Sequence, residues 1–241
     1  MLSHHWQNIM HRVLSSQCGL CRLPIQTPSY THSLRWCKHC LQLLTPVKRC
    51  QRCGLTLQKE EARMGNICGE CLVEPPPWRR LYTLGDYDFP LSQEVQRFKD
   101  HGETWHIKAL TEQLAQRIPT PAPVITSVPL HWQRYLRRGF NQSDVLARYL
   151  AKQLQTHFDS KIFRRVKHAQ SQRGNTKVNR EKNLKGAFIL NKRPQSSHVA
   201  IVDDVVTTGS TIRQLCYLLL EVDVESIDIY CICRTPAPHS L

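Results

Sequence analysis

Four C-x-x-C pairs lie within the first 75 residues, and they constrain the fold of this chain more than any other feature. Two thiolates at this spacing can bind one side of a tetrahedral metal ion, and a second pair brought near by a loop completes the coordination. A full set of four thiolates leaves no open position for water, so such sites are structural. The pairs predict two structural Zn²⁺ ions, with the ligands Cys18, Cys21, Cys37, Cys40, Cys50, Cys53, Cys68 and Cys71.

The spacing allows two ways of pairing these C-x-x-C units. Sequential pairing gives two tandem zinc ribbons, whereas an interleaved cross-brace joins the first unit to the third. We favour the sequential arrangement. Because segment 1–75 has few large apolar residues, we expect its folding to depend on metal binding.

The same cysteines bear on the cellular compartment of the protein. Eleven cysteines would suggest a disulfide scaffold in a secreted protein, but the segment 1–6 does not resemble the start of a signal peptide. No apolar run reaches the roughly 18 residues that a membrane span requires. We therefore expect a cytoplasmic protein without membrane insertion, in which the paired cysteines bind metal.

The net charge indicates the kind of partner. With 33 Lys and Arg against 19 Asp and Glu, the chain carries a formal charge of +14. Such a field attracts polyanions, either nucleic acid or small molecules rich in phosphate. Basic side chains spread over a solvated surface would give the same total, so the charge alone does not choose a partner.

The prolines at 75–77 predict a domain boundary, because proline lacks the amide that a helix or central strand needs. We expect a double zinc ribbon over 1–75 and a second domain over 76–241. In the second domain the apolar pattern predicts strands at 80–88, 124–130, 198–203 and 226–233, helices at 91–99, 104–118, 141–158 and 210–221, and a loop at 168–185. Alternating strands and helices predict an α/β fold with a parallel sheet. Cys216, Cys231 and Cys233 lie in apolar runs and are expected in its core.

One segment combines a buried strand, two adjacent carboxylates and a turn of small residues that begins a helix. Ligands bind at the carboxyl ends of the strands in open α/β sheets, which is where Asp203 and Asp204 are expected. Gly209 allows close backbone approach, and free amides at the helix start favour an anion. We expect a phosphate monoester there, bound by Thr207, Thr208, Gly209, Ser210 and Thr211. The two carboxylates suit the vicinal hydroxyls of a ribose.

These residues resemble the phosphoribosyl-diphosphate loop of the type I phosphoribosyltransferases. Further stretches resemble the ComF family, and most closely its GntX branch. The resemblance covers nearly the whole chain and includes the cysteine pairs, 75–77, 128–130, 137–142, 180–183 and 186–188. It implies a double zinc ribbon before a phosphoribosyltransferase-like domain. It also implies a role in handling incoming DNA, in natural transformation or in the use of DNA as a nutrient.

The resemblance further implies roles for single residues. Asp203 and Asp204 would bind the ribose hydroxyls, and 207–211 the 5′-phosphate. The diphosphate would lie opposite, with Arg137, Arg138, Asn141 and Gln142 as its contacts, although a solvated helix start is the alternative for the two arginines.

Arg180 and Lys182 belong to the flexible loop that closes over the reaction in the wider enzyme class, or else to a solvated run of charge. Mg²⁺ is the implied cofactor, since it bridges the oxygens of the departing diphosphate. No general base is assigned, because His131 and His168 are isolated histidines.

Two function hypotheses follow. The first is a phosphoribosyltransferase that acts on a base or nucleotide from degraded DNA. The second is a protein that binds single-stranded DNA during uptake, beside the uptake machinery, with a regulatory or relic phosphoribosyl-diphosphate site. In that case aromatic side chains would stack on bases, and the candidates are Trp36, Trp78, Trp132 and Tyr135. We favour DNA handling as the biological role and binding of the sugar phosphate as the biochemical one.

Overall fold

The computed structural model describes residues 18, 21, 23–24, 36–44, 46–58, 61, 65–101, 104–166 and 186–236, without the side chains of 101, 104–106 and 137. The chain forms two compact units, residues 1–45 and 46–241. The first unit contains the short helix α2 (Lys38–Gln42) and the cysteines from Cys18 to Cys40. The second contains the remaining cysteine pairs and an α/β domain.

The division between the units differs from the boundary expected at 75–77. The segment that carries Cys50, Cys53, Cys68 and Cys71, with its short helix α3 (Gly69–Val73), belongs to the same compact unit as the sheet. The physical reason is a set of hydrogen bonds to the first strand, such as that from the Leu81 amide to the Gln51 carbonyl at 2.9 Å. The prolines join two parts of one body.

Five parallel strands form the central sheet, in the order β1-β7-β6-β2-β3. These are β1 (Arg80–Asp86), β7 (Ser226–Arg234), β6 (His198–Val206), β2 (Val124–Ser127) and β3 (His157–Phe158). The central strands β6 and β7 are nearly continuous apolar runs because helices cover both of their faces. The prediction of an α/β fold with a parallel sheet is confirmed.

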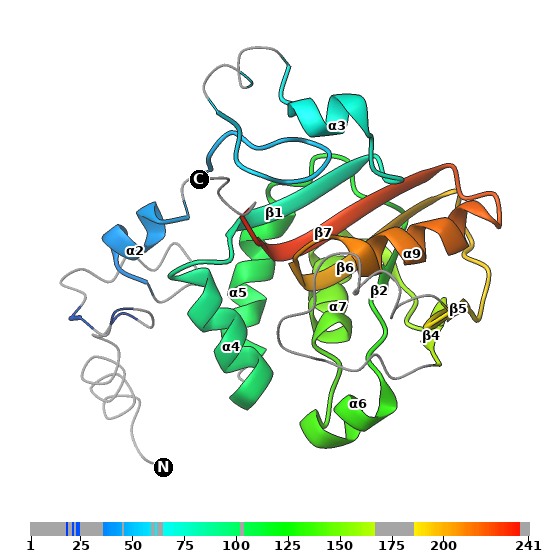
Figure 1. Ribbon diagram of the computed structural model, residues 1–241. Coiled ribbons are helices and arrows are strands. Elements are labelled where there is room, and N and C mark those ends of the chain that lie inside the picture. The colour runs from blue at the N-terminus through cyan, green and yellow to red at the C-terminus, as the bar shows by residue number, and fades with distance from the viewer. Residues whose placement is uncertain are drawn as a thin grey trace. The chain divides into compact units, whose positions relative to one another are not determined.

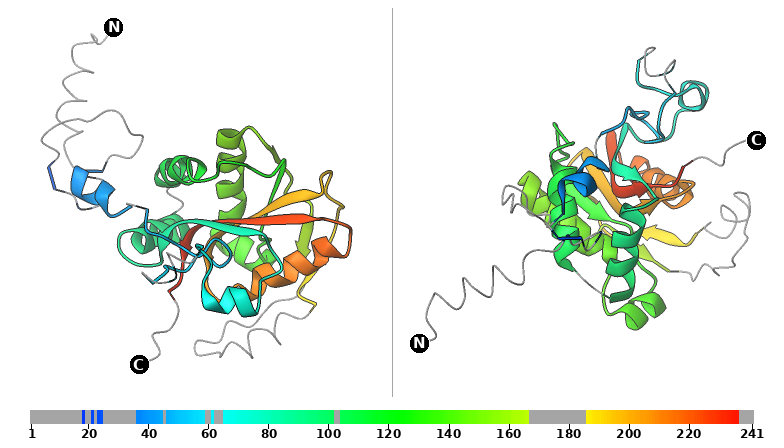
Figure 2. Two further views of the ribbon diagram at one scale, coloured as in Figure 1. Left: turned by 90° about the horizontal axis from the view of Figure 1, so that it is seen from above. Right: turned by 90° about the vertical axis from the view of Figure 1, so that its left-hand side faces the viewer.

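Helices lie on both faces of this sheet, as Figures 1 and 2 show. Helix α9 (Ser210–Leu220) covers one face, and α5 (Thr104–Ala115) and α7 (Gln142–Leu154) cover the other. Helix α4 (Leu91–His101) packs beside α5. Cys216, Cys231 and Cys233 are fully buried, as expected.

Three local features differ from the sequence expectations. The helix expected over 141–158 ends at Leu154, because Gln155 adopts a left-handed conformation and the chain then pairs with β2 as β3. A short helix, α6 (Trp132–Arg138), follows β2. A two-stranded antiparallel sheet of β4 (Phe163–Arg165) and β5 (Phe188–Leu190) packs near α9.

None of the helices within the described ranges is both long and apolar enough to cross a bilayer.

Candidate functional site

The acidic pair lies near the carboxyl end of β6, where the topology of the sheet places a ligand site. The Asp203 carboxylate accepts hydrogen bonds from the Ser143 hydroxyl at 3.0 Å and from the Asp204 amide at 3.0 Å. Burial, together with the negative charge of Asp204, raises the pKa of Asp203 to about 7. Asp203 therefore gains or loses its proton near neutral pH.

A lysine that sequence reasoning missed neutralises the second carboxylate. Lys99 comes from α4, and its ammonium lies 2.8 Å from an oxygen of Asp204. Its positive charge also opposes the rise in the pKa of Asp203. A cation is thus already present where a ribose hydroxyl or a metal ion would meet the pair.

The loop after β6 has the geometry that an anion needs. Gly209 caps α9 at φ 76°, a left-handed conformation that L side chains rarely adopt, and a Cβ there would lie 3.2 Å from the Trp78 ring. Thr207 and Thr208 are exposed. Within the described part of the chain, no protein group accepts a hydrogen bond from the amides of Thr207, Thr208, Gly209 or Thr211. Those amides are available to a ligand at the start of a helix.

A second group of polar side chains lies where β2 ends and α7 begins. The Asn141 side chain caps α7 by accepting from the Ser143 amide, and it donates to the Val128 carbonyl at 3.1 Å and to Asp144 at 2.9 Å. Asp144 also accepts from the Ser127 hydroxyl, and burial raises its pKa. Because Ser143 also donates to Asp203, the start of α7 and the acidic pair form one network.

The residues predicted to contact the diphosphate differ in their hydrogen bonding and exposure. Asn141 is engaged by the protein, so a diphosphate would have to displace one of its contacts. Gln142 is buried, and its amide nitrogen has no hydrogen-bond partner among the residues that the structure describes. Arg138 lies partly exposed at the end of α6, and Arg137 belongs to the same helix. Arg180, Lys182 and His168 lie outside the described residues.

The eight cysteines of the C-x-x-C pairs form two clusters. Their sulfur atoms lie within 4.8 Å of one another in each group, which follows the sequential pairing: Cys18, Cys21, Cys37 and Cys40 in the first cluster, and Cys50, Cys53, Cys68 and Cys71 in the second. Both clusters use the same local contact, because the Cys37 amide donates to the Cys18 sulfur and the Cys68 amide donates to the Cys50 sulfur.

The chemistry of the second cluster fits a divalent cation. A hydrogen bond from the Cys53 thiol lowers the pKa of Cys50 to about 4, whereas burial raises the pKa of Cys71 to about 12. Four thiols this close do not all ionise by themselves, and a bound Zn²⁺ stabilises all four as thiolates. Both clusters could hold zinc.

The candidate stacking residues divide into two groups. Trp36 and Trp78 are only 5% and 8% exposed, so the prediction that they are available to bases is wrong. Both side chains are buried in packed surroundings. Trp132 and Tyr135 of α6 are 61% and 49% exposed, and Leu136 beside them is 73% exposed.

Sequence reasoning missed four contributors to the site: Lys99, Ser143, Asp144 and Arg234. Arg234 ends β7 directly opposite Val206, so the rule that ligands bind at the carboxyl ends of parallel strands would have indicated it. Ser143 and Asp144 follow the recognised stretch 137–142 immediately. Lys99 carries no such signal, because only the packing of α4 brings it to β6.

Comparison with known proteins shows which family this chain resembles. Residues 136–240 match the family model described as a phosphoribosyl transferase domain. The DNA utilization protein YhgH of Escherichia coli K12 is 37% identical over 227 residues, which cover 90% of this chain and 96% of that protein. Competence protein F of Haemophilus influenzae is 35% identical over 211 residues, or 82% of this chain and 90% of that protein. The chain belongs to the ComF family.

Two solved structures align with about half of this ComF-family chain. The glutamine phosphoribosylpyrophosphate amidotransferase of B. subtilis, complexed with ADP and GMP, covers 52% of this chain and 25% of its own, at 17% identity and a TM-score of 0.37. A purine phosphoribosyltransferase from Pyrococcus horikoshii covers 54% of this chain and 83% of its own, at 15% identity and a TM-score of 0.36.

Proposed function

We propose that this ComF-family chain binds phosphoribosyl diphosphate, or a related sugar phosphate, together with Mg²⁺. We propose further that it acts in the uptake, processing or utilisation of external DNA. The second part is supported by the names of relatives that align over most of both chains, a DNA utilization protein and a competence protein. The first part is supported by the residues of the site.

The observation that carries the proposal is the free backbone at the start of α9. Among the described residues, no protein group accepts from the amides of Thr207, Thr208, Gly209 or Thr211. These amides lie at the positive end of a helix dipole, next to the acidic pair on the same strand-to-helix connection. A sugar 5-phosphate satisfies the amides, while its ribose hydroxyls donate to Asp203 and Asp204.

Magnesium fits the same residues, because carboxylate oxygens are the ligands that it prefers. Asp203 and Asp204 are the candidates to hold it, either directly or through the ribose hydroxyls. When bound, the ion supplies positive charge to the diphosphate oxygens. The protein groups orient the ribose, and Ser143 and Lys99 fix the two carboxylates.

Calorimetric titration with phosphoribosyl diphosphate and Mg²⁺ tests the proposal. We expect saturable binding that depends on Mg²⁺ and that is lost in Asp203→Asn/Asp204→Asn. Glu112→Gln, which removes one carboxylate from α5, should leave the affinity unchanged. Absence of binding to the unmodified chain would contradict the proposal. Release of diphosphate in the presence of a nucleobase would extend binding to phosphoribosyl transfer.

A specific surface favours single-stranded DNA as a second ligand. Helix α6 exposes Trp132 and Tyr135 to solvent, and Arg134 and Arg138 of the same helix are partly exposed. Exposed aromatic faces beside positive charge are the combination that binds single strands by stacking and by phosphate contacts. The excess of positive charge in the whole chain adds a long-range attraction.

Fluorescence anisotropy with a labelled single-stranded oligonucleotide tests this second ligand. Trp132→Ala/Tyr135→Ala should weaken binding by roughly tenfold or more, since stacking contributes about 1–3 kcal/mol per base. Tyr217→Ala on α9 is the matched control, because Tyr217 is exposed to the same degree as Tyr135. The affinity should also fall steeply with salt. Equal loss in the control variant would remove α6 as the interface.

A further inference from the structure

Three consecutive backbone carbonyls of the second cysteine cluster are hydrogen-bonded to the α/β domain. The Gln51 carbonyl accepts from the Leu81 amide at 2.9 Å, the Arg52 carbonyl from the Trp78 indole at 2.6 Å, and the Cys53 carbonyl from the Arg234 guanidinium at 2.9 Å. All three carbonyls belong to the turn 50–53, which begins and ends at the predicted metal ligands Cys50 and Cys53. The conformation of that turn therefore sets the positions of one indole and one guanidinium.

The Trp78 indole packs against the loop 206–209, which receives the phosphate in the proposed function. Trp78 is buried, and its ring lies so close to Gly209 that a Cβ at that position would be 3.2 Å away. The guanidinium of Arg213, in the first turn of α9, lies 5.7 Å from the centre of the same ring. A displaced Trp78 would leave the turn at Gly209 without its packing partner.

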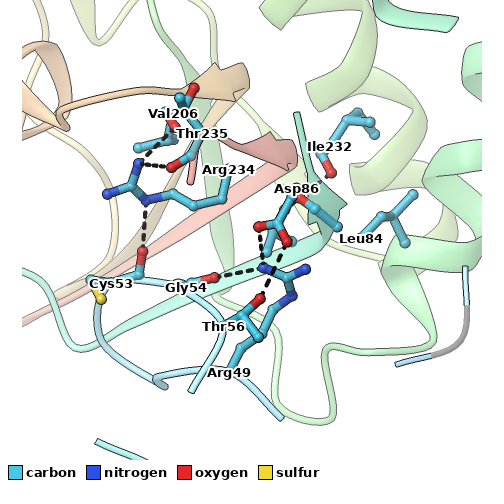
Figure 3. A network of polar contacts seen from close by, with 12 residues as sticks. Arg49, Cys53, Gly54, Thr56, Leu84, Asp86, Val206, Ile232, Arg234 and Thr235 are labelled. Carbon is cyan, nitrogen blue, oxygen red and sulfur yellow. Dashed lines mark hydrogen bonds and ion pairs between the residues drawn. The ribbon is translucent and has the colours of Figure 1, made fainter. Parts of the chain in front are cut away.

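The guanidinium of Arg234 binds the backbone where β6 ends and the loop begins (Figure 3). Arg234 donates to the carbonyls of Val206 at 3.2 Å and Thr235 at 2.8 Å, and it also donates to the Thr207 carbonyl. Burial lowers the pKa of Arg234, but an arginine still keeps its charge at neutral pH. The planar guanidinium of Arg234 thus links the Cys53 carbonyl to the carbonyls of Val206, at the end of β6, and Thr207, at the start of the loop.

We propose that the second cysteine cluster, through Trp78 and Arg234, holds the loop 206–209 in the conformation that receives the phosphate. The metal fixes the turn 50–53, the turn fixes the two side chains, and these fix the loop. Arg234 and Trp78 are positioning residues, since they act through the backbone of the loop. The consequence for ligand affinity rests on the proposed sugar-phosphate binding, whereas the ordering of the loop does not.

Backbone NMR order parameters of 207–209 test the coupling in the full-length, zinc-loaded chain. In the unmodified protein we expect values near those of rigid backbone, about 0.85. Trp78→Phe keeps an aromatic ring, although a smaller one, and removes the indole donor. Arg234→Lys loses the planar group that binds both Cys53 and Thr207. Both variants should lower the order parameters toward about 0.6. Cys68→Ser, which breaks the second cluster, should do the same. The affinity for phosphoribosyl diphosphate should fall about tenfold in each variant.

Two controls separate this coupling from general loss of structure. Arg79→Met removes an ion pair to Asp228 in the first part of β7, and it should lower stability without changing the order of 207–209. Cys37→Ser breaks the first cluster and should also leave the loop unchanged. Zinc content should stay the same as in the unmodified chain in Trp78→Phe and Arg234→Lys.

The outcomes distinguish the inference from the proposed function. A loop that is equally ordered in all variants, or already mobile in the unmodified chain, overturns the coupling even if phosphoribosyl diphosphate binds. An ordered loop that loosens in the three variants supports the coupling, even if that ligand fails to bind and the proposed function falls.

Discussion

Lys99 of α4 forms an ion pair with Asp204 of β6, with 2.8 Å between the ammonium nitrogen and a carboxylate oxygen. The pair joins a helix to the strand that ends in the phosphate loop. It also lowers the cost of placing two carboxylates next to each other in a partly buried position. A ribose hydroxyl or a Mg²⁺ ion that binds Asp204 has to share or displace this lysine.

Lys99→Met should shift the pH dependence of sugar-phosphate binding. Without the lysine, the pKa of Asp203 rises above its value of about 7, because one favourable charge is lost. Since the ionised carboxylate accepts the ribose hydroxyls, affinity should increase as pH rises through this pKa, and in the variant the midpoint should move up by about one unit. Calorimetry from pH 6 to 9 measures this midpoint. Lys108→Met, an exposed lysine on α5, should leave it unchanged.

Asp203→Asn should remove a pH dependence of stability. The pKa of Asp203 is raised from 3.8 to about 7 by folding, so the folded state binds more protons between these values. The free energy of unfolding of the unmodified chain should therefore decrease as pH rises from about 4 to 7, and this decrease should be smaller in the variant. Urea denaturation at pH 4.5 and 7.5 tests the sign. A steeper decrease in the variant would contradict the assignment.

Asn141→Ala should destabilise the start of α7. The substitution removes the N-cap and leaves the Val128 carbonyl without its side-chain donor, at an expected cost of about 1–3 kcal/mol. Asn141→Asp keeps the capping oxygen but loses the donor and brings a second carboxylate to Asp144, so its stability relative to Asn141→Ala gives a lower limit for the capping contribution. Chemical denaturation measures both. If Asn141→Ala were as stable as the unmodified chain, neither the cap nor the contact to Val128 would contribute to stability.

Asp228→Asn should be among the most destabilising single substitutions in the sheet. The Asp228 carboxylate is fully buried, and it accepts from Arg79 at 2.6 Å and from His198 at 2.9 Å. Loss of its charge leaves the Arg79 guanidinium without a counterion, which typically costs about 3–5 kcal/mol. Arg193→Met breaks an exposed ion pair with Asp223 and should cost less than about 1 kcal/mol. Thermal or urea unfolding of both variants makes the comparison.

Zinc analysis should find two ions per chain. Native mass spectrometry should show one ion after Cys18→Ser/Cys21→Ser and one ion after Cys50→Ser/Cys53→Ser, because the clusters are separate. Removing the second ion should cost the α/β domain more stability than removing the first, since that cluster belongs to the same compact unit as the sheet. In a cross-braced arrangement both substituted pairs would belong to one site, so combining all four substitutions would still leave one ion, whereas the sequential arrangement would leave none.

Local patterns in the sequence were sufficient for the two cysteine clusters, the parallel sheet and the acidic pair before the small-residue loop. Each of these follows from residues close together in the chain: cysteines two apart, an apolar run, or a glycine at a helix start. The sequential grouping of the cysteines was favoured from the sequence, and the positions of the sulfur atoms confirmed it.

Tertiary structure alone decided what surrounds those patterns. Lys99 and Asp204 are far apart in sequence and meet only because α4 packs against the domain, and Arg234 reaches Cys53 across 181 positions. The end of α7 at Leu154 and the docking of the second cluster on β1 are set by pairing between distant strands and turns. Short-range propensity specifies the elements, but the free energy of long-range hydrogen bonds and ion pairs selects how they meet, and no local pattern records that choice.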